Sequence, residues 1–452
     1  MVGSRLESII KDVSEYVEPD ASEKNNIEKI TETLIERAED AIESLPVEGD
    51  VIQVGSTARG TWISGDRDID IFICLPPSLS REKLEQYGLE VGQKVLPDGK
   101  QEYAEHPYIR GHIEGFAVDV VPCFAVEDAT EGQSAVDRTP FHTEYLQDRL
   151  NDSLRTEIRI TKQFLKGIGV YGSDLKTMGF SGYLTELLVL EYGGFVSLLN
   201  NVTEWDPPVY LDPDNHAQST FEDPLIVIDP TDPTRNVAAV VSEENVAKLI
   251  HYARECLNQP RRDLFFPSEP DPLSKSMMRN NLNERDTTPL AIRFSTPDLV
   301  EDQLHPQLRR SLDGLTAGLD RHGFDVIRSA YFTNKSTVLF VEVSVDSLAN
   351  IERHKGPPVS VQEHAKQFYE KYEGDNSVYG PFIIDGHYVV ERNRTVTTPR
   401  EFIEKNLFEI ALGRNIRDQL QSNSYEVLFG EETTQLVEEF GTELAEYFQP
   451  KL

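Results

Sequence analysis

The stretch GSTARGTWISGDRDIDIFICLP, residues 55–76, carries the strongest structural signal in the chain. Its first six residues combine two glycines with a serine and an arginine, which predicts a tight turn. The DIDIFICL that follows alternates, so Asp68 and Asp70 share one face of a strand and the isoleucines take the other. Two adjacent carboxylates on one face repel each other, which predicts that a cation neutralises them.

A third carboxylate lies in a second apolar stretch, GFAVDVVPCF at residues 115–124, where Asp119 is the only charge. If the two strands are neighbours, Asp119 joins Asp68 and Asp70 in one site. Carboxylate oxygens are the ligands that Mg²⁺ prefers, and three carboxylates suit two metal ions about 3.5–4 Å apart. The alternative is an edge strand whose aspartates face the solvent, but it leaves the glycine-rich turn unexplained.

The turn before the carboxylates offers groups that bind anions. Gly55 allows a close approach of the backbone, and Ser56 with neighbouring N–H groups can hold phosphate oxygens. Arg59 can neutralise a triphosphate. A phosphate-binding turn beside a metal site indicates an enzyme that transfers nucleotides.

The composition is strongly acidic. The 452 residues carry 78 Asp and Glu against 44 Lys and Arg, a formal net charge of −34. Acidic residues spread along the whole chain predict adaptation to molar salt, where charges are screened within about 3 Å; an ordinary acidic protein is the alternative. On charge alone, nucleic-acid binding is disfavoured. No run approaches the roughly 20 apolar residues of a membrane span, and the N-terminus is too acidic for a signal peptide, so we expect a cytoplasmic protein with no membrane partner.

The pattern along the chain predicts an α+β multidomain protein without internal repeats. Residues 27–42 have helical spacing after a frayed start, and the segment NQPRRDLFFPSEPDP at 258–272 is the expected linker. Asp385-Gly386 between two apolar runs predicts a two-residue hairpin turn. The predicted domains are a compact α/β unit at 1–150, a helical unit at 151–265 and an α/β region at 266–452.

The quoted stretch belongs to a wider set of motifs that includes VDVVPCF, RTPFHTEYL, DPTDPTRNVAAVVS and RHKGPPV. Together they resemble the archaeal, class I CCA-adding tRNA nucleotidyltransferases, which belong to the DNA polymerase beta-like nucleotidyltransferase superfamily. The matching segments span residues from about 50 to 360. One common family variant has Glu at the first carboxylate, where this chain has Asp68. Either residue can bind Mg²⁺.

The resemblance implies a nucleotidyltransferase catalytic domain, a helical central domain and C-terminal domains that contact the acceptor and TΨC arms of tRNA in a homodimer. It implies addition of CMP, CMP and then AMP to the tRNA 3′ end from CTP and ATP, with release of pyrophosphate and without a template. The implied metal ligands are Asp68, Asp70 and Asp119, and the implied nucleotide contacts are Ser56, Arg59, His142, Lys162, Tyr171 and Arg235, of which Arg235 helps to select CTP and ATP.

Other interpretations stay open at this point. A poly(A) polymerase-like or oligoadenylate synthetase-like enzyme would share the catalytic residues. A non-catalytic RNA-binding protein on a decayed transferase fold is a different class, and the presence of all three aspartates argues against it. His142 and Arg235 could serve as structural partners within loops, and Lys162 could lie on a solvated helix face. RHKGPP at residues 353–358 is a local positive cluster in an acidic chain and is a candidate tRNA contact.

The acidic composition generates a prediction about salt. Lowering KCl from molar concentration to about 0.1 M lengthens the screening distance from roughly 3 to 10 Å, so self-repulsion should destabilise the fold. Thermal melts at stepped KCl concentrations should show a melting temperature that falls on desalting. A melting temperature that stays constant or rises would contradict the halophilic interpretation.

Overall fold

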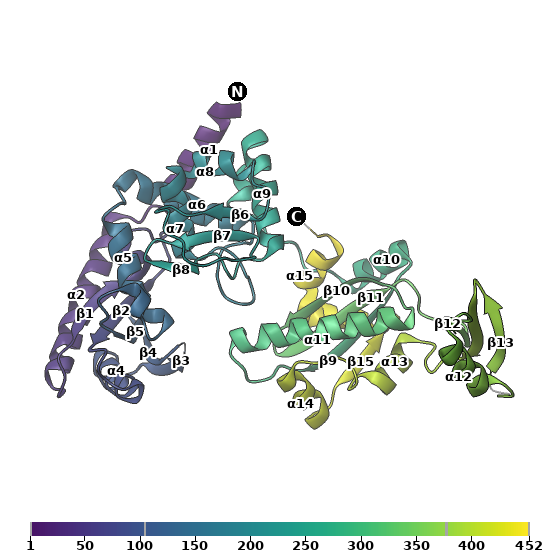
Figure 1. Cartoon of the computed structure of the whole chain (residues 1–452). Coiled ribbons are helices and arrows are strands. Elements are labelled where there is room, and N and C mark those ends of the chain that lie inside the picture. Colours follow the sequence, from purple (N-terminus) through teal and green to yellow (C-terminus); the bar gives the residue numbers. More distant parts are fainter. Residues whose placement is uncertain (1, 104, 376–377, 451–452) are drawn as a thin grey trace. The chain divides into compact units, whose positions relative to one another are not determined.

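The computed structural model describes residues 2–103, 105–375 and 378–450. It divides into two compact units, Met1–Ser268 and Glu269–Leu452 (Figure 1). The division falls inside the expected linker at 258–272. A further boundary at residue 150 stays a prediction.

The first unit contains a five-stranded sheet in the order β1-β2-β5-β4-β3. Strands β2 and β5 run parallel and are hydrogen-bonded neighbours, with Asp70 opposite Asp119, whereas the other pairs are antiparallel. The expected pairing of the two aspartate-bearing strands is therefore confirmed. The strands are β1 (Asp50–Val54), β2 (Asp68–Leu75), β3 (Lys100–Tyr103), β4 (Pro107–Ile113) and β5 (Phe116–Phe124).

Two helices, α2 (Ala21–Glu43) and α4 (Arg81–Val95), cover one face of this sheet (Figure 1). The alternating apolar residues of β2 and β5 are buried against them, among them Ile69, Ile71 and Val118. This packing fixes the strand register, because a slip by one residue would turn the aspartates into the core. The aspartates consequently lie on the opposite face.

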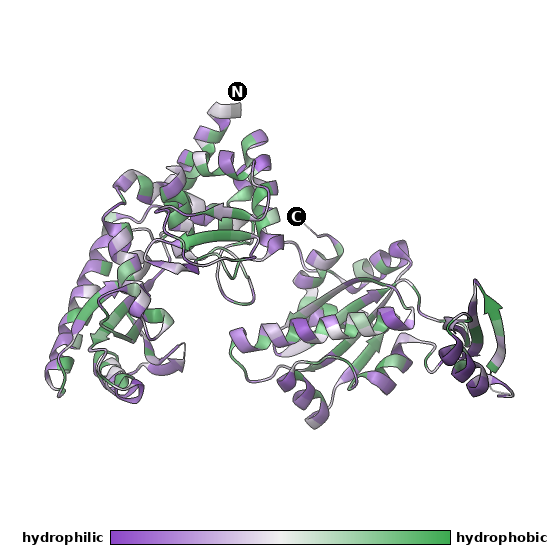
Figure 2. Cartoon of the chain, viewed as in Figure 1, coloured by the Kyte–Doolittle hydropathy of each residue, from purple (hydrophilic) through white to green (hydrophobic). Residues whose placement is uncertain are grey.

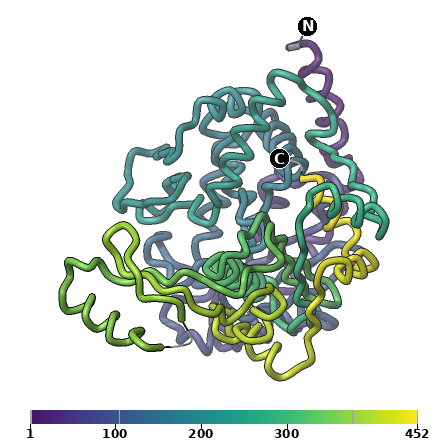
Figure 3. Tube along the Cα trace, turned by 90° about the vertical axis from the view of Figure 1, so that its right-hand side faces the viewer, coloured from purple at the N-terminus to yellow at the C-terminus, as the bar shows by residue number. Residues whose placement is uncertain are grey.

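The N-terminal segment is a regular helix, α1 (Val2–Val17), and not the frayed start that was expected. Leu6, Val13 and Val17 are buried at helical spacing. Figures 1 and 3 both place α1 alongside the helices that follow residue 150, and its contacts are with α6 and α9. The prediction was wrong because the acidic residues between these apolar positions belong to the solvent-facing side of an amphipathic helix.

Helices dominate the rest of the first unit. The apolar segment after Ser181 forms two helices, α7 and α8, that are separated at Gly193-Gly194, where both φ angles are positive. Ser242 caps α9 by accepting a hydrogen bond from Asn245 N–H. The elements are α5 (Thr139–Gln147), α6 (Asp152–Gly167), α7 (Gly182–Tyr192), α8 (Phe195–Val202), β6 (Val209–Leu211), β7 (Leu225–Asp229), β8 (Asp232–Asn236) and α9 (Glu243–Asn258).

Among the described residues, no single helix has the length and apolar composition to cross a membrane. The bent pair α7 and α8, which meet at 90°, passes that test by length and composition only. Most of their apolar side chains are buried in the protein core.

The second unit has a four-stranded sheet in the order β10-β11-β9-β15 and a separate three-stranded sheet in the order β12-β14-β13. Figure 2 shows hydrophilic and hydrophobic faces along helix α11 (Glu301–His322), whose apolar side packs on the larger sheet. The hairpin at Asp385-Gly386 is confirmed, with φ angles of 48° and 74°. The RHKGPP cluster lies on β12.

The remaining bounds are α10 (Lys275–Arg285), β9 (Thr288–Ser295), β10 (Val326–Thr333), β11 (Ser336–Val343), β12 (Ile351–Pro358), α12 (Gln362–Tyr372), β13 (Val378–Ile384), β14 (His387–Asn393), α13 (Pro399–Asn406), α14 (Arg414–Ser422), β15 (Glu426–Phe429) and α15 (Val437–Phe448).

Candidate active site

Three carboxylates and one guanidinium share the face of the sheet opposite α2 and α4. Asp70 lies directly across from Asp119 on the neighbouring strand, and Asp68 is two residues away on the same side. Arg110 on β4 is opposite Asp119 in register. Its Nη2 is 3.7 Å from Asp68 Oδ1 and its Nε is 3.6 Å from Asp119 Oδ1. The sequence reasoning missed Arg110, although it alternates with the apolar residues of PYIRGHI.

The charges of these carboxylates are poorly compensated. Burial, together with the charges of Asp119 and Asp68, raises the pKa of Asp70 from 3.8 to about 7. Burial also raises the pKa of Asp119. Asp119 Oδ1 is buried without a hydrogen-bond partner. A buried carboxylate oxygen without a hydrogen bond, beside carboxylates that repel each other, fits a divalent cation. The cation would coordinate that oxygen and would also neutralise the repelling charges.

The side chains as they stand do not enclose an ion. Across residues 2–103, 105–375 and 378–450, no three His, Cys, Asp or Glu side chains form a group that could hold a metal. The Arg110 guanidinium lies against Asp68 and Asp119. Closer convergence of these carboxylates would require Arg110 to move.

The expected turn before the aspartates is a short helix, α3 (Gly55–Arg59). Gly55 has φ +80°, and a Cβ there would lie 2.1 Å from Asp70 Oδ2. Glycine is favoured here, because a side chain would be strained at this positive φ and would displace the Asp70 carboxylate. Ser56 follows directly and is partly buried in the first turn of α3. Ser56 is thus the next residue along the chain after the glycine that approaches Asp70.

Arg59 and Lys162 converge on one buried carboxylate, Glu186 of α7. Arg59 Nε is 2.6 Å from Glu186 Oε2, and Lys162 Nζ is 2.7 Å from Glu186 Oε1. The side-chain exposures of the three are 7%, 3% and 0%. Burial opposes the ionisation of Glu186, but the charges of Arg59 and Lys162 lower its pKa to about 2. The solvated-face interpretation of Lys162 is therefore wrong.

Tyr171 and Lys166 lie at the end of α6. Lys166 Nζ is 5.5 Å from the centroid of the Tyr171 ring and 2.8 Å from Asp66 Oδ2. Burial raises the pKa of the Tyr171 hydroxyl, so it stays protonated. Tyr171 can therefore donate a hydrogen bond in the neutral pH range.

His142 and Arg235 converge on a second buried carboxylate, Asp229 at the end of β7. His142 Nε2 is 2.9 Å and Arg235 Nη1 is 2.6 Å from Asp229 Oδ2. The imidazole stacks on Tyr183, with ring centroids 3.9 Å apart. Burial lowers the pKa of His142 despite the carboxylate, which favours the neutral imidazole. A cavity of about 590 Å³ lies beside Arg235 and Arg138.

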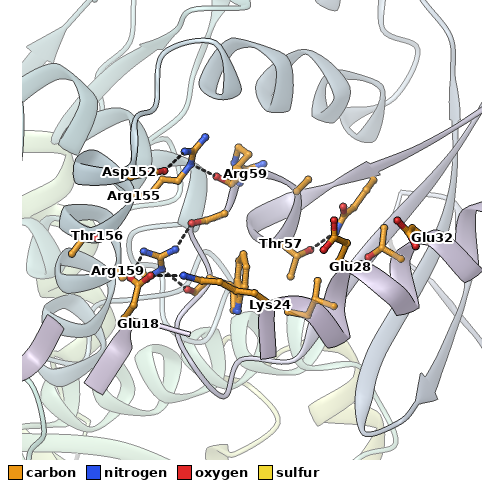
Figure 4. Close-up of a pocket in the computed structure, with 16 residues that line it drawn as sticks. Glu18, Lys24, Glu28, Glu32, Thr57, Arg59, Asp152, Arg155, Thr156 and Arg159 are labelled. Carbon is orange, nitrogen blue, oxygen red and sulfur yellow. Dashed lines mark hydrogen bonds and ion pairs between the residues drawn. The ribbon is translucent and has the colours of Figure 1, made fainter. Parts of the chain in front are cut away.

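A larger cavity, of about 760 Å³, lies between α2, α3 and α6 (Figure 4). None of Asp68, Asp70 and Asp119 lines it. Figure 4 shows that its basic side chains already have partners, for example Arg155 with Asp152 and Arg159 with Glu18. The cavity thus borders Arg59 but does not include the three aspartates.

Comparison with known proteins places this geometry in a family. The family "Nucleotidyltransferase domain" matches residues 35–145, "tRNA nucleotidyltransferase, second domain" matches 156–266, and "CCA-adding enzyme, C-terminal domain" matches 285–430. The CCA-adding enzyme of Haloarcula marismortui is 53% identical over 100% of both chains. The chain belongs to the archaeal CCA-adding enzymes.

Other CCA-adding enzymes have similar identity. That of Halobacterium salinarum is 54% identical and that of Halorubrum lacusprofundi 50%, each over 98% of this chain and 99% of the relative. These halophilic relatives agree with the acidic composition. The expectation that net charge disfavours nucleic-acid binding was wrong, because a CCA-adding enzyme acts on tRNA, and net charge does not describe local surfaces.

Sequence reasoning did not find the carboxylates that organise the two basic clusters. Glu186 lies in the mostly apolar run GYLTELLVLEY, where a charged residue among buried apolar neighbours is itself a signal of a buried ion pair. Asp229 ends the apolar strand LIVID in the same way. Both patterns indicate a buried charge but do not identify its partner.

The raised pKa of Asp70 predicts a stability effect in this CCA-adding enzyme. Without metal, Asp70 releases its proton near pH 3.8 in the unfolded chain and near pH 7 in the folded one, so the folded state loses stability as the pH rises through this interval. Asp70→Asn should therefore melt at least about 2 °C above wild type at pH 8 in EDTA, the shift that ~1 kcal/mol gives at this size.

The difference in melting temperature between Asp70→Asn and wild type should shrink as the pH falls from 7 to 4, because wild-type Asp70 is then protonated. Asp50→Asn, an exposed position on β1, is the matched control and should show neither effect. An Asp70→Asn melting temperature equal to or below that of wild type at pH 8 would contradict the repulsion.

Proposed function

We propose that this CCA-adding enzyme carries out CMP and AMP transfer at a site formed by Asp68, Asp70 and Asp119 with bound Mg²⁺. The observation that carries the proposal is the parallel pairing of β2 and β5, which puts all three carboxylates on one face. When bound, Mg²⁺ would activate the tRNA 3′-hydroxyl and neutralise charge on the triphosphate and the leaving pyrophosphate. The remaining task of the protein is to position the two substrates.

The triphosphate would lie against α3 and the Glu186 cluster. Arg59 and Lys162 bring two positive charges to the single negative charge of Glu186, so the cluster keeps a net positive charge that attracts phosphates. Both side chains are almost fully buried, so they would act on the phosphates mainly through this charge and less through direct contact. Ser56 and Tyr171 would add hydrogen bonds to phosphate oxygens.

The base and ribose would lie on the other side, toward His142 and Arg235. Both side chains bind Asp229, and the Arg235 side chain stays 33% exposed next to the 590 Å³ cavity. Guanidinium N–H groups only donate hydrogen bonds. They would pair with the acceptor nitrogens of C and A and meet N–H donors in U and G, which a fixed pocket excludes.

The tRNA would be held by its acceptor and TΨC arms, in part through the RHKGPP cluster on β12. Arg353 there is 69% exposed in its side chain, although it pairs with Glu391 at 3.2 Å. A few exposed positive groups of this kind can contact phosphates despite the negative net charge. From the family resemblance, we also propose that the enzyme is a homodimer, and from the composition that it is cytoplasmic.

A primer-extension assay tests the proposal. The substrate is tRNA lacking its last three nucleotides, with Mg²⁺ and CTP, ATP or both, in molar KCl. We expect two C residues with CTP alone, little addition with ATP alone, and a stop at CCA with both. Long A tails with ATP alone would instead indicate a poly(A) polymerase, and tRNA binding without extension a pseudoenzyme.

Replacing Asp70 by Asn tests the residues in the same assay. The substitution keeps the shape and removes a metal-binding oxygen, so transfer should fall by at least about a thousandfold, the order expected for losing an electrostatic contact to the transition state. Asp50→Asn should keep the wild-type rate. Asp70→Asn activity above about a tenth of wild type at saturating Mg²⁺ would rule out the assignment, with the threshold set by ~1.4 kcal/mol.

A further inference from the structure

The segment DPTDPTR at residues 229–235 contains the same three-residue turn twice. Asp229 Oδ1 accepts hydrogen bonds from Thr231 N–H at 3.0 Å and from its hydroxyl at 2.9 Å. Asp232 Oδ1 accepts the same pair from Thr234, at 3.0 and 2.6 Å. Each aspartate thus closes its own turn with one carboxylate oxygen. The second oxygen is not needed for the turn.

The two aspartates differ in what the second oxygen does. Asp229 Oδ2 receives Arg235 Nη1 at 2.6 Å and His142 Nε2 at 2.9 Å. Asp232 Oδ2 lies 3.6 Å from Arg138 Nη1, beyond hydrogen-bond distance. Asp229 is fully buried, whereas the Arg235 side chain is 33% exposed, so solvent screens their bond from one side only. The second turn lines the cavity and lies against Arg138, but only the first one binds Arg235.

Side chains of three other residues, Tyr183, His142 and Arg235, contact the Asp229 carboxylate. Tyr183 donates its hydroxyl to Oδ1 at 3.1 Å, and the same ring stacks on His142. Burial opposes the charged form of Asp229, but the bond to His142 and the Arg235 charge keep its pKa below the usual range. The carboxylate is therefore a fixed anionic anchor for one edge of the Arg235 guanidinium.

We propose that Asp229 is a positioning residue for base selection and acts by fixing the guanidinium plane of Arg235. The proposal rests on the proposed role of Arg235 in base recognition. A guanidinium held at one Nη keeps its other N–H donors in a defined direction, because the group is planar. A freely rotating Arg235 could turn to accommodate the N–H edge of U, and discrimination would fall.

The test measures kcat/KM for CTP divided by kcat/KM for UTP on tRNA lacking its last three nucleotides. Asp229→Asn keeps the turn to Thr231 but presents an amide, which lacks the charge that holds Arg235. The CTP preference should fall by about tenfold or more, as expected when a directed hydrogen bond is lost from a specificity pocket. Asp128→Asn changes an equivalent exposed turn, in which Asp128 Oδ1 accepts hydrogen bonds from Thr130 N–H at 2.8 Å and from its hydroxyl at 2.6 Å. Asp128 does not line the cavity, so this variant should leave the ratio within about twofold of wild type, less than ~0.5 kcal/mol.

A double-mutant cycle separates positioning from a general structural effect. Arg235→Lys keeps the charge but loses the planar donors, so it should lower the ratio. Adding Asp229→Asn to Arg235→Lys should then cause no further loss. If Arg235→Lys alone leaves the ratio unchanged, the proposed role of Arg235 fails, and this inference fails with it. If Arg235→Lys lowers the ratio and Asp229→Asn does not, only this inference fails.

A thermal melt in molar KCl checks that each variant folds. Asp229→Glu provides a second variant that keeps the negative charge but moves it by one methylene, and it should also lower the CTP preference. Wild-type discrimination in every folded Asp229 variant would overturn the proposal.

Discussion

The repulsion among Asp68, Asp70 and Asp119 is the constraint on which the first unit depends. Their strands must be parallel neighbours in one register for the three charges to meet. Holding them together costs stability, which is visible in the raised pKa of Asp70 and in the orphaned oxygen of Asp119. The apolar packing of the opposite sheet face on α2 and α4 offsets this cost. Sites that store strain of this kind are typical of catalysis.

Two buried carboxylates connect the residues after 150 to α3 and α5 in the preceding part of the chain. Glu186 binds Arg59, which lies 127 residues earlier in the sequence, and Asp229 binds His142, which lies 87 residues earlier. A buried ion pair contributes little net stability, but removing one partner leaves an unpaired buried charge. The pairs therefore act mainly by fixing the positions of basic side chains, and they define the two sides of the proposed nucleotide site.

The aspartates and the sheet pairing were predictable because they depend on short-range signals. The alternation of DIDIFICL fixed the face shared by Asp68 and Asp70, and the lone Asp119 in an apolar run indicated the partner strand. The partners Glu186 and Asp229 were not predicted, because only the tertiary fold decides which buried charge meets which. Helix α1 was missed for a local reason: its charged face concealed the apolar spacing of Leu6, Val13 and Val17.

The most direct test of the account is to locate divalent ions in crystals of the enzyme grown with Mn²⁺ and a non-hydrolysable CTP analogue. Anomalous difference maps should show Mn²⁺ at about 2.0–2.3 Å from oxygens of Asp70 and Asp119, near the short oxygen-ligand distances of hard divalent cations, with Arg110 turned away from Asp68 and Asp119. Nucleotide bound with full occupancy but no Mn²⁺ at these aspartates would contradict the central claim.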